Sequence, residues 1–337
     1  MKAWQYILKR LLMLIPVLIG VTILTFSISH LVPANPVSLA LGPRGTPEMA
    51  QKLKAKWGLD KPVYVQYLIY VKRLLKGDLG ASLYTNRPVS RDLKEYFPAT
   101  LELTTVSLLL CLIMGIPLGI IAAVKKDTLV DHFARVFSIF GVSMPYYWLG
   151  LLLLFIFYFK LGIVPGGGRL SPLTPSPEHI TGLYILDSLL TGNLETLKDG
   201  IMHIITPAFC LSFAIMGVIS RMTRSSMLNV LSEDYIKTAE AKGLTRNRVV
   251  YQHALRNAIL PVITISGVLY GQLMAGAILT EMIFSWPGMG LYTVNSIIHL
   301  DFQPVMGFTI VVAIVYVTIN LIVDILYVLF DPRIRLE

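Results

Sequence analysis

The sequence of 337 residues is 55% apolar and only 15% charged, and its formal net charge is +9. A soluble domain usually carries about 25% charged residues, so a chain built only from soluble domains is excluded. The charges are clustered, and long runs without Asp, Glu, Lys or Arg separate the clusters. This composition indicates an integral membrane protein.

Six runs of the chain contain no charged residue. A helix needs about 20 apolar residues to cross the hydrocarbon layer, because it rises about 1.5 Å per residue across roughly 30 Å. Every run meets this length. The runs lie between residues 10 and 44, 102 and 125, 135 and 160, 199 and 221, 256 and 281, and 301 and 324. They predict an all-α membrane protein with six transmembrane helices.

The first run follows Lys2, Lys9 and Arg10, which could form the basic start of a cleaved signal peptide. Its apolar stretch is too long for a signal sequence, and no A-x-A cleavage site follows it. We therefore expect a retained first helix. Cys111 and Cys210 both fall inside expected membrane helices and form neither a disulfide framework nor a metal-binding spacing.

Basic residues sort the connecting loops into two sets. Lys and Arg favour the cytoplasmic side of short loops. The N-terminal segment, the second and fourth loops and the C-terminal tail are rich in them, whereas the fifth loop, residues 282–300, has none. We expect both chain ends to lie in the cytoplasm. The positive net charge reflects this topology and calls for no nucleic-acid partner.

The chain then divides into two parts. Residues 1–99 hold the first transmembrane helix and a long extracytoplasmic loop, and residues 100–337 form a five-helix core with a cytoplasmic loop at 221–256. In the long loop, Thr46 and Pro47 are typical of a helix start. A second start at Pro62 leads into an apolar stripe with helical spacing, which Gly77 would end. Such a helix can lie on the membrane, pack on the bundle or receive a partner protein.

The cytoplasmic loop 221–256 contains two short predicted helices. Ser232 can cap the first, whose acidic residues Glu233 and Asp234 suit a helix N-terminus, and Gly243 would end it. Thr245 can start the second, residues 246–255. Helices of about ten residues are marginal alone in water. The loop therefore either packs on its own bundle or is held by a cytoplasmic partner.

Motifs in this loop and beyond it carry a family resemblance. The loop contains Arg221-Met-Thr-Arg-Ser-Ser-Met-Leu, then Glu233-Asp-Tyr-Ile-Lys-Thr-Ala-Glu-Ala-Lys-Gly-Leu, then His253-Ala-Leu-Arg-Asn-Ala-Ile-Leu-Pro261. Elsewhere stand Gly77-Asp-Leu-Gly80, Gly115-Ile-Pro-Leu-Gly119, Gly276-Ala-Ile-Leu-Thr-Glu281, Phe284-Ser-Trp-Pro-Gly-Met-Gly290 and Asp331-Pro-Arg-Ile-Arg335. In this order they resemble ABC-importer permeases, specifically the first of the two permease subunits of the dipeptide, oligopeptide and nickel uptake family. The likeness covers almost the whole chain.

One departure narrows the resemblance. The general importer motif has Glu-Ala-Ala six residues before its glycine and a proline about thirteen after it. This chain has Lys237-Thr238-Ala239 and Arg256 at those places. The peptide-permease branch is similar in this respect, so Glu240 does not take the role of the general motif's glutamate.

The resemblance implies a subunit of a larger importer in a prokaryotic inner membrane. It implies a homologous second permease subunit, two cytoplasmic ATPase subunits and an extracytoplasmic solute-binding protein that delivers peptides, nickel or oligosaccharides. This chain would form half of the translocation pathway through the lipid bilayer. It contains no Gly-Lys dipeptide, which a phosphate-binding P-loop requires. We therefore expect no catalytic residues and no cofactor on this chain.

The resemblance also assigns site residues. The ATPase would dock on the first short helix of the loop, with a small apolar face around Ala239 against it. An outer gate would come from the extracytoplasmic loops, and the loop around the Trp-Pro-Gly kink is the candidate. The ATPase-coupling residues are Glu233, Asp234, Tyr235, Ile236, Lys237, Thr238, Ala239, Glu240, Ala241, Lys242, Gly243 and Leu244; the gate residues are Phe284, Trp286, Pro287 and Gly288.

Two other functional classes remain as alternatives. A stand-alone secondary transporter or channel predicts inverted repeats with broken helices and buried charges, and the sequence shows neither. A membrane enzyme that uses magnesium needs clustered carboxylates. Asp127 and Asp131 form one D-x-x-x-D pair without a second cluster, so helix capping is the preferred interpretation and no metal site is expected.

A few ionisable residues fall within or beside the expected spans. His30, Glu102, His203 and Asp324 lie at or near expected helix ends, where polar side chains reach the membrane interface. Only His203 lies well inside a run, and we interpret it as a hydrogen-bonded histidine between helices. A proton relay is the alternative.

Overall fold

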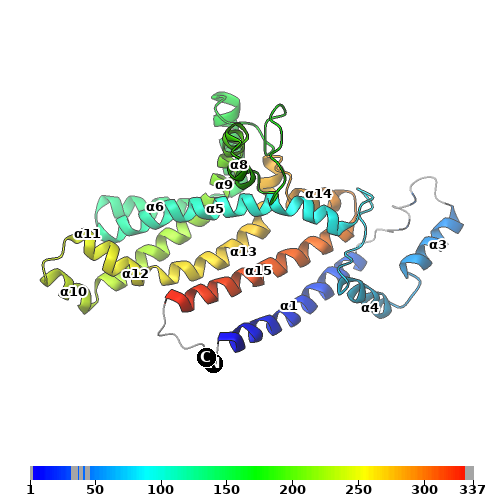
Figure 1. Cartoon of the computed structure of the whole chain (residues 1–337), viewed down its shortest axis with the longest axis horizontal. Helices are drawn as coiled ribbons and strands as arrows, with labels where there is room; N and C mark the ends of the chain where they lie inside the picture. The colour runs from blue at the N-terminus through cyan, green and yellow to red at the C-terminus, as the bar shows by residue number, and fades with distance from the viewer. Residues whose placement is uncertain (1–2, 32–36, 38–40, 42–45, 331–337) are drawn as a thin grey trace.

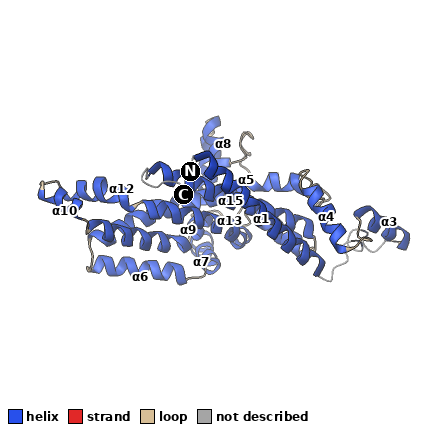
Figure 2. Ribbon diagram, turned by 90° about the horizontal axis from the view of Figure 1, so that it is seen from below, coloured by secondary structure: helices blue, strands red, loops and turns tan. Residues whose placement is uncertain are grey.

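The computed structural model describes residues 3–31, 37, 41 and 46–330, and helices make up most of this part of the chain (Figures 1 and 2). The described residues form no strand, only an isolated bridge between Ala81 and Pro88. The fold is all-α, as the sequence predicts. The helices are α1 (Ala3–Leu31), α3 (Pro47–Trp57), α4 (Val63–Leu74), α5 (Val89–Val124), α6 (Leu129–Ser143), α7 (Tyr146–Leu153), the π-helical η2 (Leu154–Lys160), α8 (Tyr184–Thr191), α9 (Leu194–Leu231), α10 (Asp234–Ala241), α11 (Arg246–Arg248), the π-helical η3 (Val249–Ala254), α12 (Leu255–Ala258), α13 (Leu260–Ile283), α14 (Met289–Ile298) and α15 (Phe302–Phe330).

Four helices of the described part are long and apolar enough to cross a membrane. They are α5, α9, α13 and residues 302–323 of α15. The bent pair formed by α6 and α7 with η2 adds a fifth if it makes a single span, and α1 contributes a shorter apolar stretch at Ile15–Leu31. The chain is therefore a multi-span membrane protein. The count of six spans and the cytoplasmic location of both ends stay predictions.

The third expected span is sharply bent. α6 ends at Ser143, α7 begins at Tyr146, and the two helical segments meet at 98°. Pro145 accounts for the break, because a proline disfavours helical backbone at the residue before it. Met144 takes an extended conformation with ψ 126°. The absence of charges in this run does not reveal the bend.

The centre of the molecule is the contact between α5 and α9, with α13 packed against both. Small residues let the two helices approach closely, as in other membrane bundles. A Cβ atom added to Gly119 on α5 would lie 2.6 Å from the backbone oxygen of Ser220 on α9. One turn earlier, Gly115 faces Ile219 with similarly little space. The motif Gly-Ile-Pro-Leu-Gly is therefore a packing element of α5.

The long helices hold two groups of short elements at opposite ends of the molecule (Figure 1). α10, α11 and α12 lie at one end, which we call the coupling end. α14, α4 and α3 lie at the other, which we call the outer end. α1 packs beside α15, and the described start of α1 and end of α15 both point toward the coupling end.

The long loop after α1 contains both helices that its sequence predicts. α3 begins at Pro47, and the Thr46 hydroxyl accepts a hydrogen bond from the amide of Met49 at 3.3 Å. α4 begins after Pro62 and packs on α1, where the hydroxyls of Tyr67 and Thr22 lie 3.0 Å apart. Packing on the bundle is thus the correct interpretation for this face of α4.

Candidate functional site

The first helix of the loop 221–256 is α10, and its start differs by one residue from the expectation. Glu233 stands at the N-cap, and α10 begins at Asp234. Ser232 ends α9 instead, and its hydroxyl donates to the backbone oxygen of Asn229 at 2.7 Å. The expected cap at Ser232 is therefore wrong. Asp234 still lies in the first turn, where a carboxylate is stabilised by the helix dipole.

α10 has an inner face that packs on its own chain. Ile236 is 1% exposed and Ala239 7% exposed. Both belong to an apolar cluster that includes Ile120 of α5 and Val250 of η3. The expectation that Ala239 faces an ATPase is wrong, because this side chain is covered from within. The spacing of three residues between Ile236 and Ala239 places both on one helix face.

The outer face of α10 carries the remaining residues assigned to coupling. Glu233, Asp234, Tyr235, Lys237, Thr238, Glu240, Ala241, Lys242 and Gly243 are exposed, and Leu244 is half-buried. Polar contacts fix parts of this face without covering it. The side-chain Nδ2 of Asn257 donates to the Tyr235 hydroxyl at 2.8 Å, and Arg246 forms an ion pair with Glu240.

Gly243 ends α10 in the way that the sequence predicts. Its φ is +77°, which a residue with a side chain adopts only at a steric cost. No atom lies within 4 Å of the position that a Cβ would take. Backbone conformation alone therefore selects glycine here.

The second helix of the loop is longer than expected and is joined to a membrane helix. α11, η3 and α12 follow one another without a gap from Arg246 to Ala258. Only Ile259 separates them from α13, and its backbone is helical too. α10 is therefore connected at its start to the end of α9 and, through α11, η3 and α12, to the start of α13. Both long helices reach from the coupling end toward the outer end (Figure 1).

The loop after α13 holds the expected gate residues, and most of them are buried. Phe284 is 2% exposed and Trp286 1% exposed, whereas Pro287 is exposed. The backbone oxygen of Phe284 accepts a hydrogen bond from the amide of Gly168 at 2.9 Å. The Trp286 indole nitrogen donates to the backbone oxygen of Ala99 on α5 at 2.9 Å. The loop is thus fastened to the bundle on two sides.

A buried carboxylate also holds the loop after α13 in place. Glu281, at the end of α13, is fully buried and accepts hydrogen bonds from the Thr100 hydroxyl at 2.6 Å and the amide of Leu291 at 2.9 Å. Gly288 and Gly290 pack directly on this carboxylate, so a Cβ at either position would collide with it. The glycines of the motif therefore make room for Glu281.

Glu102 is buried in an ion pair, whereas its place in the sequence suggested an exposed helix end. It is 5% exposed, and Arg169 donates to its carboxylate at 2.6 Å. The guanidinium of Arg169 also stacks on the Tyr184 ring, 3.5 Å from the ring centre. The amide of Ile185 completes the contact with a 2.7 Å hydrogen bond to Glu102. This pair joins α5 to the loop before α8.

His203 is buried, but its hydrogen bond lies within its own helix. Nδ1 is 2.8 Å from the backbone oxygen of Asp199, one turn earlier in α9. The same nitrogen lies 3.4 Å from the Asp199 carboxylate. The hydrogen bond expected between helices thus lies within α9, although the ring is hydrogen-bonded as predicted.

The loop before α8 is organised by Asp187. Its carboxylate accepts hydrogen bonds from the amides of Ile180, Thr181 and Gly182 and from the Thr181 hydroxyl. Burial by itself would raise the pKa of Asp187, but the bonds from Thr181 and the amides hold that pKa below its usual range. The charged form of Asp187 therefore stabilises this loop.

Asp131 makes a contact that the sequence did not reveal. Arg224 on α9 donates to its two oxygens, from Nε at 2.6 Å and from Nη2 at 2.7 Å. Asp131 also accepts from the amide of Asp127 at 3.0 Å, but this amide precedes the N-cap residue Thr128, and no side chain caps α6. Its side chain is fully buried.

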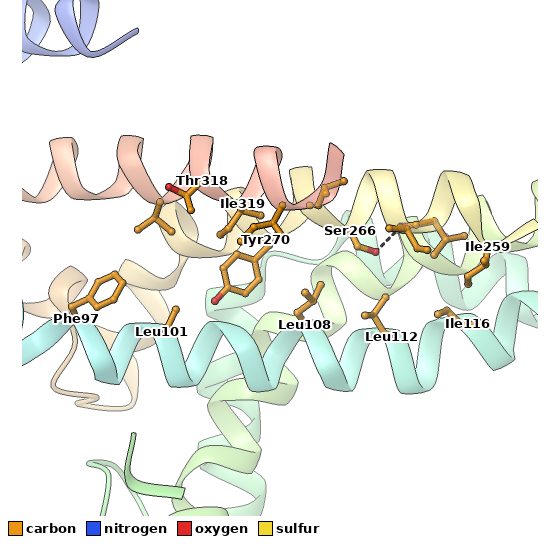
Figure 3. Close-up of a pocket in the computed structure, with 16 residues that line it drawn as sticks. Phe97, Leu101, Leu108, Leu112, Ile116, Ile259, Ser266, Tyr270, Thr318 and Ile319 are labelled. Atoms are coloured by element: carbon orange, nitrogen blue, oxygen red, sulfur yellow. Dashed lines mark hydrogen bonds between the residues drawn. The ribbon is translucent and has the colours of Figure 1, made fainter. Parts of the chain in front are cut away.

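An apolar groove of about 810 Å³ lies between α5, α13 and α15 (Figure 3). Its lining includes no charged side chain, and its polar groups are Ser266, Tyr270 and Thr318. Each of these is hydrogen-bonded within the chain. A solute with charged ends finds no partner there. An apolar groove of this kind suits a lipid acyl chain or a helix of another membrane subunit.

Comparisons with known proteins place this geometry in context. Residues 115–336 match the family model described as binding-protein-dependent transport system inner membrane component, and residues 3–104 match the model for its N-terminal part. The probable D,D-dipeptide transport system permease protein DdpB of Escherichia coli (strain K12) is 48% identical over 334 residues, which are 99% of this chain and 98% of that protein. The dipeptide transport system permease protein DppB of Alkalihalophilus pseudofirmus is 45% identical, over 98% of this chain and 99% of the relative. The oligopeptide transport system permease protein AppB of Bacillus subtilis (strain 168) is 39% identical, with the same coverage.

Proposed function

Since the chain belongs to the family of inner membrane components of binding-protein-dependent transport systems, we propose that it moves short peptides across a prokaryotic inner membrane. It is the permease subunit of an ABC importer. The family excludes the stand-alone secondary transporter that the sequence left open. The names of the relatives favour a dipeptide or a short oligopeptide as the solute over nickel or an oligosaccharide.

The proposal includes the partners that such a subunit needs. A second, homologous permease subunit completes the pathway, two cytoplasmic ATPase subunits supply the energy, and an extracytoplasmic binding protein delivers the peptide. Six spans with both ends in the cytoplasm place α10 on the side of the ATPase. The start of α1 and the end of α15 point toward the end that carries α10, which supports this arrangement.

The observation that carries the proposal is that α10 connects two long helices, α9 and α13. Its inner face is anchored by Ile236 and Ala239, so α10 cannot move independently of the bundle. Its outer face, with Tyr235, Lys237 and Ala241, is free to meet a partner. A displacement of α10 by the ATPase therefore reaches α9 and α13 together.

A displacement of α13 would change contacts at its outer end. Glu281 lies in the last turn of this helix, the loop from Phe284 to Gly288 follows it directly, and the hydrogen bonds of Glu281 and Trp286 reach α5. In our proposal, a shift of α13 against α5 breaks these contacts and opens the outer gate. The fastened loop described above is then the closed state.

Reconstitution tests the proposal. The chain is co-expressed and purified with the proposed ATPase subunits and second permease, and the complex is reconstituted into proteoliposomes with the binding protein. Uptake of a radiolabelled dipeptide is then measured with and without ATP. We expect ATP-dependent uptake that requires the binding protein. The chain purified alone should neither bind nor hydrolyse ATP. Uptake that proceeds without the ATPase subunits would overturn the proposal.

A further inference from the structure

We propose that Asp131 and Arg224 are positioning residues that bind α6 to α9, so that the bent unit of α6 and α7 carries movement of the coupling loop to Phe284. This inference rests on the proposed function, because it gives movement of the coupling loop (residues 221–256) a second route to the outer loop (residues 284–288). The first route is α13. The second runs through a part of the chain that is remote from α13 in sequence.

The ion pair has the geometry of a firm mechanical link. Arg224 presents two nitrogens to the two oxygens of Asp131, at 2.6 and 2.7 Å, and such paired contacts fix orientation as well as distance. Arg135, one turn later on α6, places its Nε 3.7 Å from the same carboxylate. Arg224 lies two turns before the end of α9, so it moves with the start of the cytoplasmic loop. Any displacement of α10 is therefore felt at Asp131.

Close packing continues the link along both helices. A Cβ atom on Gly217 of α9 would collide with the backbone oxygen of Ser138 on α6. Further along, a Cβ on Gly141 of α6 would lie 3.1 Å from the backbone oxygen of Phe213 on α9. With backbones this close, the helices cannot slide far past each other without collision. α6 and α9 therefore form one body from Asp131 to Gly141.

The bend turns this body toward the outer loop. After Met144 and Pro145 the chain continues as α7, and the Cys210 thiol of α9 donates to the backbone oxygen of Tyr146 at 3.0 Å. α7 then packs on Phe284: a Cβ on Gly150 would lie 3.3 Å from the Phe284 ring. Leu149 and Leu153 share one buried cluster with Phe284 and Phe213. α7 is thus a surface on which Phe284 rests.

The pair holds the start of α6, which lies beyond the close backbone contacts at Ser138 and Gly141. α6 has an exposed apolar face there, with Leu129, Phe133 and Val136 all more than half exposed. The Asp131–Arg224 contact is the polar tie between that end of α6 and α9. Replacement of Asp131 leaves Arg224 without its carboxylate partner, and loss of the Arg224 contact leaves the buried Asp131 with only the more distant Arg135. Either change favours separation of the two ends.

The test measures gate movement and ATP hydrolysis in the assembled complex. A cysteine replaces the exposed Ser285, and its labelling by a membrane-impermeant thiol reagent is followed from outside with and without ATP; Cys111 and Cys210 are both buried. Asp131→Asn removes the charge of the pair. Arg224→Lys keeps the charge but loses the two-pronged contact. The Asp131→Arg/Arg224→Asp double variant restores a pair with reversed charge. Glu95→Gln, in an exposed ion pair with Arg87, is the matched control.

We expect wild type and Glu95→Gln to show an ATP-dependent change in labelling at residue 285. In Asp131→Asn and Arg224→Lys the complex should still hydrolyse ATP, because α10 is intact, while uptake per ATP falls by about tenfold. The labelling change should disappear in both and return in the double variant. If either single variant fails to assemble, the other is read in the same assay. A full labelling response in an assembled Asp131→Asn or Arg224→Lys complex would overturn the inference alone. The absence of any response in wild type would instead overturn the proposed coupling of α10 to the gate.

Discussion

Trp286 donates its indole N–H to the backbone oxygen of Ala99, and this 2.9 Å bond joins the loop after α13 to the first third of α5. Both groups are buried. The bond spans the two helices whose relative movement the proposed mechanism requires. It is therefore a contact that must be broken and remade in every transport cycle.

Trp286→Phe should weaken the closed state. The substitution keeps most of the buried ring but loses the hydrogen bond to the Ala99 oxygen, at a cost of about 0.5–1.5 kcal/mol. We expect a higher ATPase rate without peptide and a thermal unfolding midpoint that falls by a few degrees. Trp148→Phe, at a ring that is 48% exposed, serves as the control. Equal basal ATPase rates in the two variants would contradict the prediction.

Gly243→Val should impair uptake more than Gly243→Ala. The space around the position is open, so the cost is that of a positive φ, about 1–2 kcal/mol for alanine, and it is greater for the β-branched valine. Gly243→Asn should be milder, since asparagine tolerates this conformation better. The measurement is ATP-driven uptake with ATPase retained on purification. Asn247→Ala, at an exposed position, is the neutral comparison.

Ala239→Asp and Ala241→Asp should fail in different ways. Ala239 is covered by its own chain, so a carboxylate there disrupts the packing of α10 at a cost of several kcal/mol. Ala241 is exposed, and a carboxylate there leaves the fold intact but meets the partner. Limited proteolysis of the loop separates the two: we expect rapid cleavage in Ala239→Asp only, and ATPase loss in both. Equal proteolysis would contradict the assigned faces of α10.

Asp187→Asn should loosen the extracytoplasmic loop and remove its acid sensitivity. Because the pKa of Asp187 is lowered in the folded chain, its contribution is present above the ordinary value of 3.8 and is lost as the pH falls through the lower folded value. An amide cannot accept the bonds of both oxygens, so we expect faster protease cleavage of residues 161–183 at neutral pH. Glu195→Gln, at an exposed site, is the control. Unchanged cleavage in Asp187→Asn would refute the role of the carboxylate.

Labelling of single cysteines tests the orientation. Cysteines at Ser232 and Asn247 should react only from the cytoplasmic side, and a cysteine at Asn295 only from outside; all three sites are exposed. Ser171 is half-buried, and its amide and hydroxyl both donate to Asp199. Leu173, which is 97% exposed, is the better outer site. Reaction of positions 232 and 295 from the same side would rule out the proposed topology.

Local signals in the sequence identified the elements well. Thr46, Pro62 and Gly243 mark helix boundaries through the geometry of their own backbone or side chain, which needs no knowledge of distant residues. Pro145 is also a local signal for a helix break, but the uniform apolar composition around it favoured a single continuous span. The inward direction of Ala239 was also available, because Ile236 lies one turn earlier on the same face.

Contacts between distant parts of the chain were beyond the reach of the sequence. Glu102 meets Arg169 across 67 residues, and Asp131 meets Arg224 across 93. Neither pair leaves a local pattern, since each charge alone resembles a helix end at the membrane interface. The structure identifies them by proximity and burial.

The anchored inner face of α10 has a consequence for assembly. A segment that folds only on its partner must lose conformational freedom at the moment of binding, and this lowers affinity for a given contact area. α10 is already ordered by Ile236 and Ala239 before any other subunit arrives. Recognition by the ATPase can then be close to rigid docking, and the permease can be inserted and finished in the membrane before the cytoplasmic subunits join it.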